Sequence, residues 1–297
     1  MQNPLRRSTA FEQYIAPAHA HAALWRVVAS AGLVFGVLIG AGILIGSILL
    51  RMGVGEAEAL GAGAMLTSRN GTLLLLSSFV LWWAGLALAL RLFHRRRLRS
   101  LFGPDLSIGL RRFAIGAGLA LGFAALSAAI GAALVGPPVR SGLSIGTWLG
   151  GAALALPLLL IQTGAEEALF RGYLQQQLAA RFRSALIWAV LPSVLFGLLH
   201  WNPAAPGSIG AVVAITTLSG LLFAILTART GGLGLAWGMH FGVNVSVLVF
   251  IAPRDYLSGV ALMHWVPEPE VFSRLVWLDL LMIIVLVALA ALWAARR

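Results

Sequence analysis

The sequence contains no cysteine and no lysine, and only 10% of its 297 residues are charged. Without cysteine, the chain cannot have a disulfide framework, a thiol nucleophile or a metal site made of thiolates. Soluble domains carry about 25% charged residues. The low charge and a hydrophobic content of 60% therefore predict an integral membrane protein, which we expect in a bacterial inner membrane.

Long apolar runs are the main feature that is present. A run of about 20 apolar residues is needed to cross a hydrocarbon core about 30 Å thick. We see no ten-residue segments of alternating polarity, which would be typical of a transmembrane β-barrel. The prediction is an all-α, polytopic transmembrane helical bundle, a single integral-membrane domain over residues 1–297. About eight spans are expected: Val27–Leu50, Gly71–Leu92, Phe113–Val135, one that starts near Ile145, Ala185–His200, Ile209–Ala228, Gly232–Ile251 and Leu275–Ala295.

The net charge of +11 comes from arginines that flank these apolar runs. Arginines in short loops orient a membrane protein with those loops in the cytoplasm. The strongest cluster, Arg91–Arg99 with Arg111 and Arg112, follows the second span. We therefore predict cytoplasmic N- and C-termini, with residues 1–26 as a cytoplasmic tail. The expected partner of the arginines is the lipid bilayer, and nucleic acid is not expected.

Small residues recur in the first span, where Gly32, Gly36 and Gly40 are four residues apart. Such a pattern predicts that a neighbouring helix approaches closely at these glycines. The fourth span continues past residue 167 as Tyr173–Arg183, where Leu174, Leu178 and Phe182 are four residues apart, opposite glutamines and arginines. This pattern predicts a cytoplasmic, amphipathic extension of that span.

Ionisable side chains occur at very few positions within the spans. A charged residue at the centre of a membrane helix costs about 2.5–3.5 kcal/mol on insertion scales, so it indicates a functional site. Glu166 and Glu167 are adjacent, and the patterns Phe196-x-x-x-His200 and His240-x-x-x-Asn244 each place two side chains on one helix face. We left three other residues out of the site: Asp279, expected in the hydrated interface, His94 and His264.

The two glutamates are expected to differ in role. Adjacent helical residues point about 100° apart, so both cannot face one site squarely. Glu167 precedes Arg171 by four residues, a spacing that suits an ion pair, and Glu166 is then left for chemistry. If the chain turns near Arg183, Glu166 and His200 are equally far from the turn and should lie at the same depth.

Three motifs, E-E-x-x-x-R at Glu166–Arg171, F-x-x-x-H at Phe196–His200 and H-x-x-x-N at His240–Asn244, resemble the CPBP family. This family contains CAAX-prenyl endopeptidases and bacteriocin-processing or immunity proteins, also called Abi. The resemblance covers roughly residues 150–251, the expected catalytic core. It implies an intramembrane endopeptidase that acts on a membrane-associated protein or peptide. It also implies that Glu166 and His200 activate water, that His240 and Asn244 stabilise the oxyanion, and that Glu167, Arg171 and Phe196 support them.

Two alternatives stay open at this point. Glu166, His200 and His240 would suit zinc with one position left for water, although the chain has no H-E-x-x-H motif and a glutamate with a histidine can activate water alone. A non-proteolytic membrane scaffold or immunity-type binding protein is the other class. A transporter is less favoured because we find no internal repeat. Nothing in the sequence indicates prenylated substrates.

Overall fold

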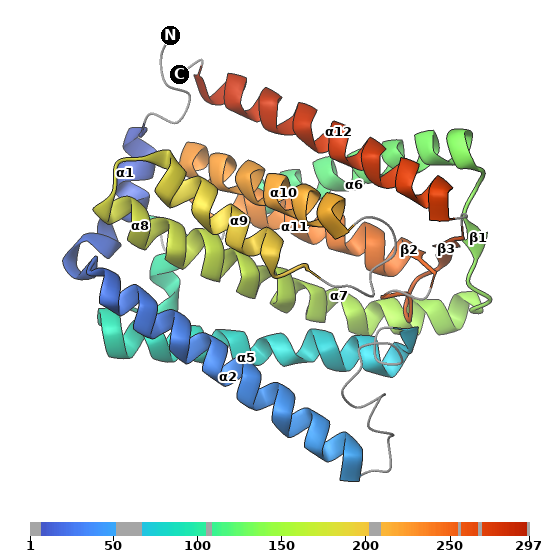
Figure 1. Ribbon diagram of the computed structural model, residues 1–297, viewed down its shortest axis with the longest axis horizontal. Coiled ribbons are helices and arrows are strands. Elements are labelled where there is room, and N and C mark those ends of the chain that lie inside the picture. The colour runs from blue at the N-terminus through green and yellow to red at the C-terminus, as the bar shows by residue number, and fades with distance from the viewer. Residues whose placement is uncertain are drawn as a thin grey trace.

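A bundle of long helices forms most of the structure. The computed structural model describes residues 7–51, 67–104, 109–201, 209–254, 257–266 and 269–295. The long helices are α2 (Leu24–Arg51), α5 (Arg69–His94), α6 (Leu110–Val135), α7 (Ile145–Glu167), α10 (Ile209–Thr230) and α12 (Pro269–Ala295), and most of them run lengthwise through the molecule (Figure 1). The predicted all-α polytopic membrane bundle is confirmed, and the protein is an integral membrane protein.

Six of the eight expected spans correspond, among the described residues, to helices long and apolar enough to cross a membrane. The other two are shorter apolar helices. The fifth consists of a π-helical segment, Leu186–Val190, and α9 (Leu191–Leu198). The seventh consists of α11 (Gly234–Val245) and a π-helical segment, Ser246–Phe250. His200 lies in the turn just after α9, and His240 lies in the middle of α11.

The helix that contains the glutamates is longer than α7 alone. It continues through a π-helical segment, Ala168–Gln175, into α8 (Gln176–Arg181). The expected amphipathic extension is not solvated, because Gln175, Gln176 and Gln177 are all buried. Gln175 donates to the carbonyl of Ala224 on α10, and Gln176 donates to that of Ser100 in the 3-10 turn Leu98–Leu101. Other parts of the chain therefore cover the face expected to meet water.

The N-terminal segment is one of these covering parts. It forms α1 (Thr9–Ile15), which is capped by the Ser8 side chain, and a 3-10 turn, Ala16–His21. The side chains of Phe11, Tyr14 and Ile15 are buried, and the Phe11 ring lies 4.8 Å from that of Trp188. Within the expected tail, residues 9–21 are therefore packed against the bundle instead of extending from it, because α1 has an apolar face.

Close approach between helices occurs at glycines other than those expected. A Cβ atom at Gly32, Gly36 or Gly40 would meet nothing within 4 Å among the described residues, so the prediction that a neighbouring helix approaches closely at this stripe is wrong for this part of the chain. The helix pair α2–α5 instead meets at Gly85, where a Cβ would lie 3.5 Å from the Cα of Val34. The pattern of small residues shows that a face is flat, but it does not show which face a neighbour covers.

The two ends of the bundle differ. A three-stranded sheet of β1 (Val139–Arg140), β3 (Met263–Trp265) and β2 (Ile251–Pro253), in that order, lies at one end. Its β1–β3 pair is antiparallel and its β2–β3 pair is parallel. The helix α1 lies at the opposite end (Figure 1). At that end Arg112 donates to the carbonyl of Thr230, so the arginine-rich segment after α5 and the end of α10 lie together. That this end is cytoplasmic stays a prediction.

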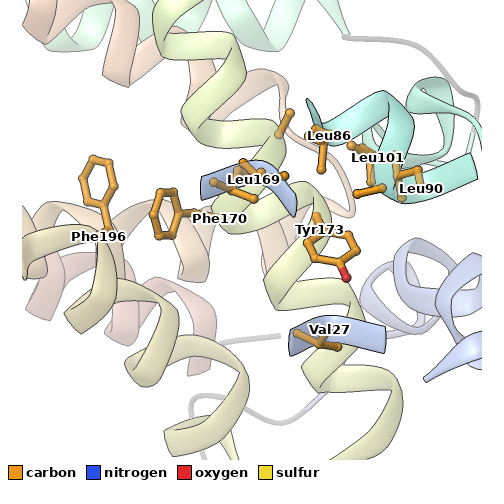
Figure 2. Packing of buried hydrophobic residues seen from close by; sticks show 11 residues of the cluster. Val27, Leu86, Leu90, Leu101, Leu169, Phe170, Tyr173 and Phe196 are labelled. Carbon is orange, nitrogen blue, oxygen red and sulfur yellow. The ribbon is translucent and has the colours of Figure 1, made fainter. Parts of the chain in front are cut away.

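A cluster of buried side chains lies next to the glutamates. Figure 2 shows Leu169 and Phe170, from the π-helical segment, among side chains of α2, α5 and α9. Phe170 and Phe196 are in ring contact, with centroids 5.1 Å apart. Both are equally far from Arg183 in sequence, so α9 runs back along the glutamate helix in the register that the sequence predicts.

Candidate active site

The imidazole of His240 lies between the two glutamates. Its Nδ1 is 2.9 Å from Oε1 of Glu167, and its Nε2 is 3.3 Å from Oε2 of Glu166. All three side chains are buried, with Glu167 fully enclosed. The sequence predicts that the two carboxylates cannot both face one site squarely, but His240, from another helix, contacts both through its two ring nitrogens.

Glycine determines how closely α11, which carries His240, packs against its neighbours. A Cβ at Gly164 would lie 2.5 Å from the ring of Trp237, and one at Gly242 would lie 2.7 Å from the carbonyl oxygen of Ala117 on α6. Trp237 also donates to the hydroxyl of Thr163 at 3.1 Å. Because α11 is held on both sides, its position relative to the glutamates is fixed.

Arg171 compensates the charge of Glu167. Its Nη1 lies 3.0 Å from Oε1 of Glu167, and its side chain is 1% exposed. The guanidinium is surrounded by three aromatic rings, whose centroids are 4.6 Å (Phe196), 5.4 Å (Phe223) and 5.7 Å (Phe170) from Cζ. A buried cation of this kind is stable only with a close counter-ion and aromatic faces, so Arg171 and Glu167 depend on each other.

Aromatic rings also fix the orientation of His240. Phe223 of α10 stacks on the imidazole at 5.4 Å with an interplanar angle of 22°. Phe196 meets it edge-on at 5.7 Å and 83°. With the contact to Glu167, these rings leave the imidazole little freedom to rotate. Phe196 thus contacts both His240 and Arg171.

His200 is placed differently from the other expected residues. Its Nδ1 lies 2.9 Å from the carbonyl oxygen of Phe196, and its ring is 4.8 Å from the Phe196 ring. In the described parts of the chain it makes no hydrogen bond or ion pair with either glutamate. Glu166 lies four residues before Phe170, and His200 lies four residues after Phe196. Because the two phenylalanine rings are in contact and α9 runs back along the glutamate helix, His200 and Glu166 lie in the same layer of the bundle. Phe196 is therefore the link between His200 and the glutamates.

Asn244 has a partner that the sequence did not reveal. Its Nδ2 donates to Oε1 of Gln162 at 2.8 Å, and Gln162 is almost fully buried. Gln162 precedes Glu166 by four residues, so both lie on one face of α7. The available signal was an amide in an otherwise apolar span, one turn before the glutamate. Phe223 had no comparable signal, because its helix is apolar all round.

The positions of Glu166, His200 and His240 do not fit a zinc site. Both nitrogens of His240 face carboxylates, while Nδ1 of His200 faces the Phe196 carbonyl. Among the described residues, no three His, Cys, Asp or Glu side chains gather in a metal-binding arrangement. Glu166, His200 and His240 therefore do not converge on a common point, and no chemical step is derived through a metal.

The three residues left out of the site lie elsewhere. Asp279 accepts a hydrogen bond from Ser127 of α6 at 2.7 Å, and His264 is on β3. His94 is buried in a second polar cluster, where its Nε2 lies 2.8 Å from the Tyr173 hydroxyl and 3.2 Å from that of Ser30. None of these contacts involves the two glutamates.

Comparison with known families identifies the segment that carries this site. Residues 147–246 match the family model described as "Type II CAAX prenyl endopeptidase Rce1-like". The resemblance to the CPBP family is confirmed. The matched segment begins in α7 and ends just after α11, so it contains all three motifs. This Rce1-like match supports an intramembrane CAAX-type endopeptidase as the general class.

A curated relative is similar to this chain over a segment of comparable length. The chain is 33% identical over 109 residues to "Uncharacterized protein YyaK" of Bacillus subtilis (strain 168). The alignment covers 36% of this chain and 36% of the relative, so the chain matches about a third of that relative's length. A search of solved structures finds no match.

Proposed function

We propose that this protein is an intramembrane endopeptidase that hydrolyses a peptide bond in a membrane-associated protein or peptide of a bacterial inner membrane. The Rce1-like match over residues 147–246 supports the class. The observation that carries the proposal is the position of His240, which contacts both buried carboxylates, Glu166 and Glu167. Buried acid and base groups held in contact are typical of catalytic sites.

Hydrogen bonding around His240 supports a proton shared with Glu166. Nδ1–H donates to Glu167, so Nε2 is the atom that faces Oε2 of Glu166. An ionised carboxylate and a bare imidazole nitrogen both accept hydrogen bonds, and they attract each other only if one carries a proton. We infer that a proton moves between these two atoms. Glu166 is then suited to accept a proton from water and return it later.

The proposed reaction uses water and the side chains of the site. Water attacks the carbonyl carbon of the peptide while its proton passes to Glu166. The carbonyl oxygen becomes an oxyanion, which Asn244 and protonated His240 stabilise, and one such donor is typically worth about 3–4 kcal/mol. The C–N bond then breaks as Glu166 delivers the proton to the leaving nitrogen. Gln162 holds the amide of Asn244 in place.

His200 is proposed to assist the same water. Its Nδ1–H donates to the carbonyl of Phe196, which leaves Nε2 as an acceptor, the form in which histidine can act as a base. Because His200 lies in the layer of Glu166, a water molecule could be shared by the two side chains. We propose a metal-independent mechanism on this basis, consistent with a donor set that does not converge.

Purified protein in liposomes tests the proposal with a library of membrane-associated peptides, each in prenylated and unprenylated form. We expect cleavage by the wild type that is insensitive to a chelator and that falls at least about a hundredfold in His200→Ala, the lower range for a general acid–base group. Chelator sensitivity reversed by zinc would contradict the glutamate mechanism. Unaltered cleavage by His200→Ala would show that His200 takes no part in the mechanism. Peptide binding without any cleavage would favour a non-proteolytic membrane scaffold.

A further inference from the structure

Four buried polar side chains form a second feature next to the site, between the glutamate helix and α10. Glu167, Arg171 and Gln175 recur at every fourth residue, and Thr227 lies on α10. Their exposed fractions are 0%, 1%, 0% and 0%. We call these four residues the buried polar column. The proposed reaction uses Glu167 and Arg171 as an ion pair and does not use Gln175 or Thr227.

Each residue of the column has one polar atom without a hydrogen-bond partner among the described residues. These atoms are Oε2 of Glu167, Nη2 of Arg171, Oε1 of Gln175 and Oγ1 of Thr227. In folded proteins more than nine-tenths of buried polar groups are paired, with protein or with ordered water. Four exceptions in adjoining side chains therefore point to a ligand that satisfies them together.

Contacts with α10 place these atoms in sequence along one helix interface. Nη2 of Arg171 lies 2.9 Å from the Cβ position of Gly220. Gln175 donates to the carbonyl of Ala224 at 3.0 Å, and Thr227 is one turn beyond Ala224. The positions 220, 224 and 227 share one face of α10. From Glu167 to Gln175 the column extends roughly 12 Å, at about 1.5 Å per residue.

The chemistry of the four atoms identifies the ligand. Nη2 of Arg171 is a donor, Oε2 of Glu167 and Oε1 of Gln175 are acceptors, and the Thr227 hydroxyl is both. A cation would be repelled by Arg171 and an anion by Glu167. Water donates and accepts, and a buried water molecule typically makes about three hydrogen bonds. A chain of water molecules is the ligand that satisfies all four.

We propose that the buried polar column binds a chain of water molecules, which connects the Glu167–Arg171 ion pair with the end of the bundle covered by α1. Helix α1 contacts that end directly, because Ser8 donates to the carbonyl of Ala228, next to Thr227. The column hydrates a buried ion pair whether or not the protein cleaves peptides. If it does, the same route supplies the water that hydrolysis consumes.

A double-variant cycle tests for the bound water without an activity assay. Thr227→Val keeps the shape of the side chain and removes its hydroxyl, and Gln175→Met does the same for the amide. If the hydroxyl is dry and unpaired, Thr227→Val raises the unfolding temperature of the purified protein. If the water chain is present, Thr227→Val lowers the unfolding temperature. The double variant then lowers it by less than the sum of the two single-variant changes. A rise, or additive effects, would overturn the bound water.

The connection to bulk water is tested by thiol reactivity, which the absence of native cysteine makes possible. Thr227→Cys is compared with Ala236→Cys, a position that is equally enclosed but lies in an apolar cluster. We expect silver ions to react at least tenfold faster with the thiol at position 227 in folded protein. Equal rates would overturn the connection, and neither result depends on whether a substrate is cut.

Discussion

The charge balance of the site depends on individual residues. Glu167 accepts from both Arg171 and His240, so it holds the cation and orients the imidazole at the same time. Among the described residues, the side chain within ion-pair distance of Glu166 is His240, at 3.3 Å. The two adjacent carboxylates thus differ in role because Glu167 lies one helical turn before an arginine and Glu166 does not.

Removing Glu167 should destabilise the fold severely. Glu167→Ala leaves Arg171 as an uncompensated buried charge. We therefore expect the free energy of unfolding to fall by about 3–5 kcal/mol. Glu12→Ala removes the half-exposed carboxylate of the Arg7–Glu12 pair and should change stability by about 1 kcal/mol or less. Denaturation in detergent measures both. Adding Arg171→Met to Glu167→Ala should recover much of the loss, and no recovery would contradict the ion-pair account.

Gln162 should influence catalysis through Asn244. Gln162→Leu removes the acceptor that holds the Asn244 amide, whereas Gln162→Glu retains an oxygen there. We expect kcat to fall about tenfold or more in the leucine variant, with KM little changed and a smaller loss in Gln162→Glu. Steady-state cleavage kinetics separate these effects. An equal loss in both variants, or a loss confined to KM, would show that Gln162 does not position Asn244.

At the scale of elements, the helix pair α6–α11 and the N-terminal helix α1 hold the site together. A Cβ at Gly238 would overlap the backbone of Phe113, with the Cα of Phe113 only 2.9 Å away. At α1, the single O–H of Tyr14 is shared by the carbonyls of Leu101, at 2.9 Å, and Arg171, at 3.1 Å. Arg171 lies in the π-helical segment of the glutamate helix. Distant segments therefore complete the hydrogen bonding of the glutamate helix.

Glycine at the α6–α11 contact should be irreplaceable. Gly238→Ala forces α11 away from α6 and should lower the unfolding temperature by several degrees and displace His240. Gly36→Ala on α2 meets nothing within 4 Å and should be neutral or slightly stabilising, since alanine is favoured over glycine in helices by up to about 1 kcal/mol. Thermal unfolding of the two variants compares them. Similar effects would contradict the assigned packing.

Tyr14 provides a test of the N-terminal helix. Burial raises the pKa of the Tyr14 phenol, so its hydroxyl stays protonated and donates throughout the physiological pH range. Tyr14→Phe keeps the ring and removes the one O–H that the carbonyls of Leu101 and Arg171 share. We expect a loss of about 1–3 kcal/mol in the free energy of unfolding, measured by denaturation. A variant as stable as the wild type would show that α1 does not support the π-helical segment.

At the scale of the whole molecule, the sheet lies at one end of the bundle and α1 lies at the other (Figure 1). The exposed arginines at the second end include Arg91, Arg95, Arg97, Arg99, Arg181 and Arg183. By the positive-inside rule we predict that this end faces the cytoplasm. Glu166 and Glu167 lie well along their helix from both ends, so substrate and water must each reach a site enclosed by helices.

Single cysteines should report this orientation. Ser184→Cys lies in the exposed turn after α8, and Val139→Cys lies on the exposed β1. In bacterial spheroplasts, an impermeant thiol reagent should label position 139 and not position 184. Both should be labelled once the membrane is opened. The reverse pattern would contradict the predicted orientation.

The sequence predicted features that depend on composition and on spacing within one helix. Apolar runs located six long helices, and the four-residue spacing located the partner of Glu167. Contacts between helices were less accessible. The glycines of α2 do not show which face is covered, Phe223 resembles any other apolar residue, and the seven-residue α1 is too short for a periodic signal. Such features depend on which helices become neighbours, and spacing within one helix does not contain that information.

Comparing Glu166→Gln with the wild type in a peptide-cleavage assay tests the central claim most directly. The substitution keeps the size of the side chain and removes its ability to accept and return a proton. With Glu12→Gln as the matched surface control, we predict that Glu166→Gln retains the folded state and loses cleavage at least about a hundredfold, while the control cuts like the wild type. Cleavage by folded Glu166→Gln at the wild-type rate would contradict the account.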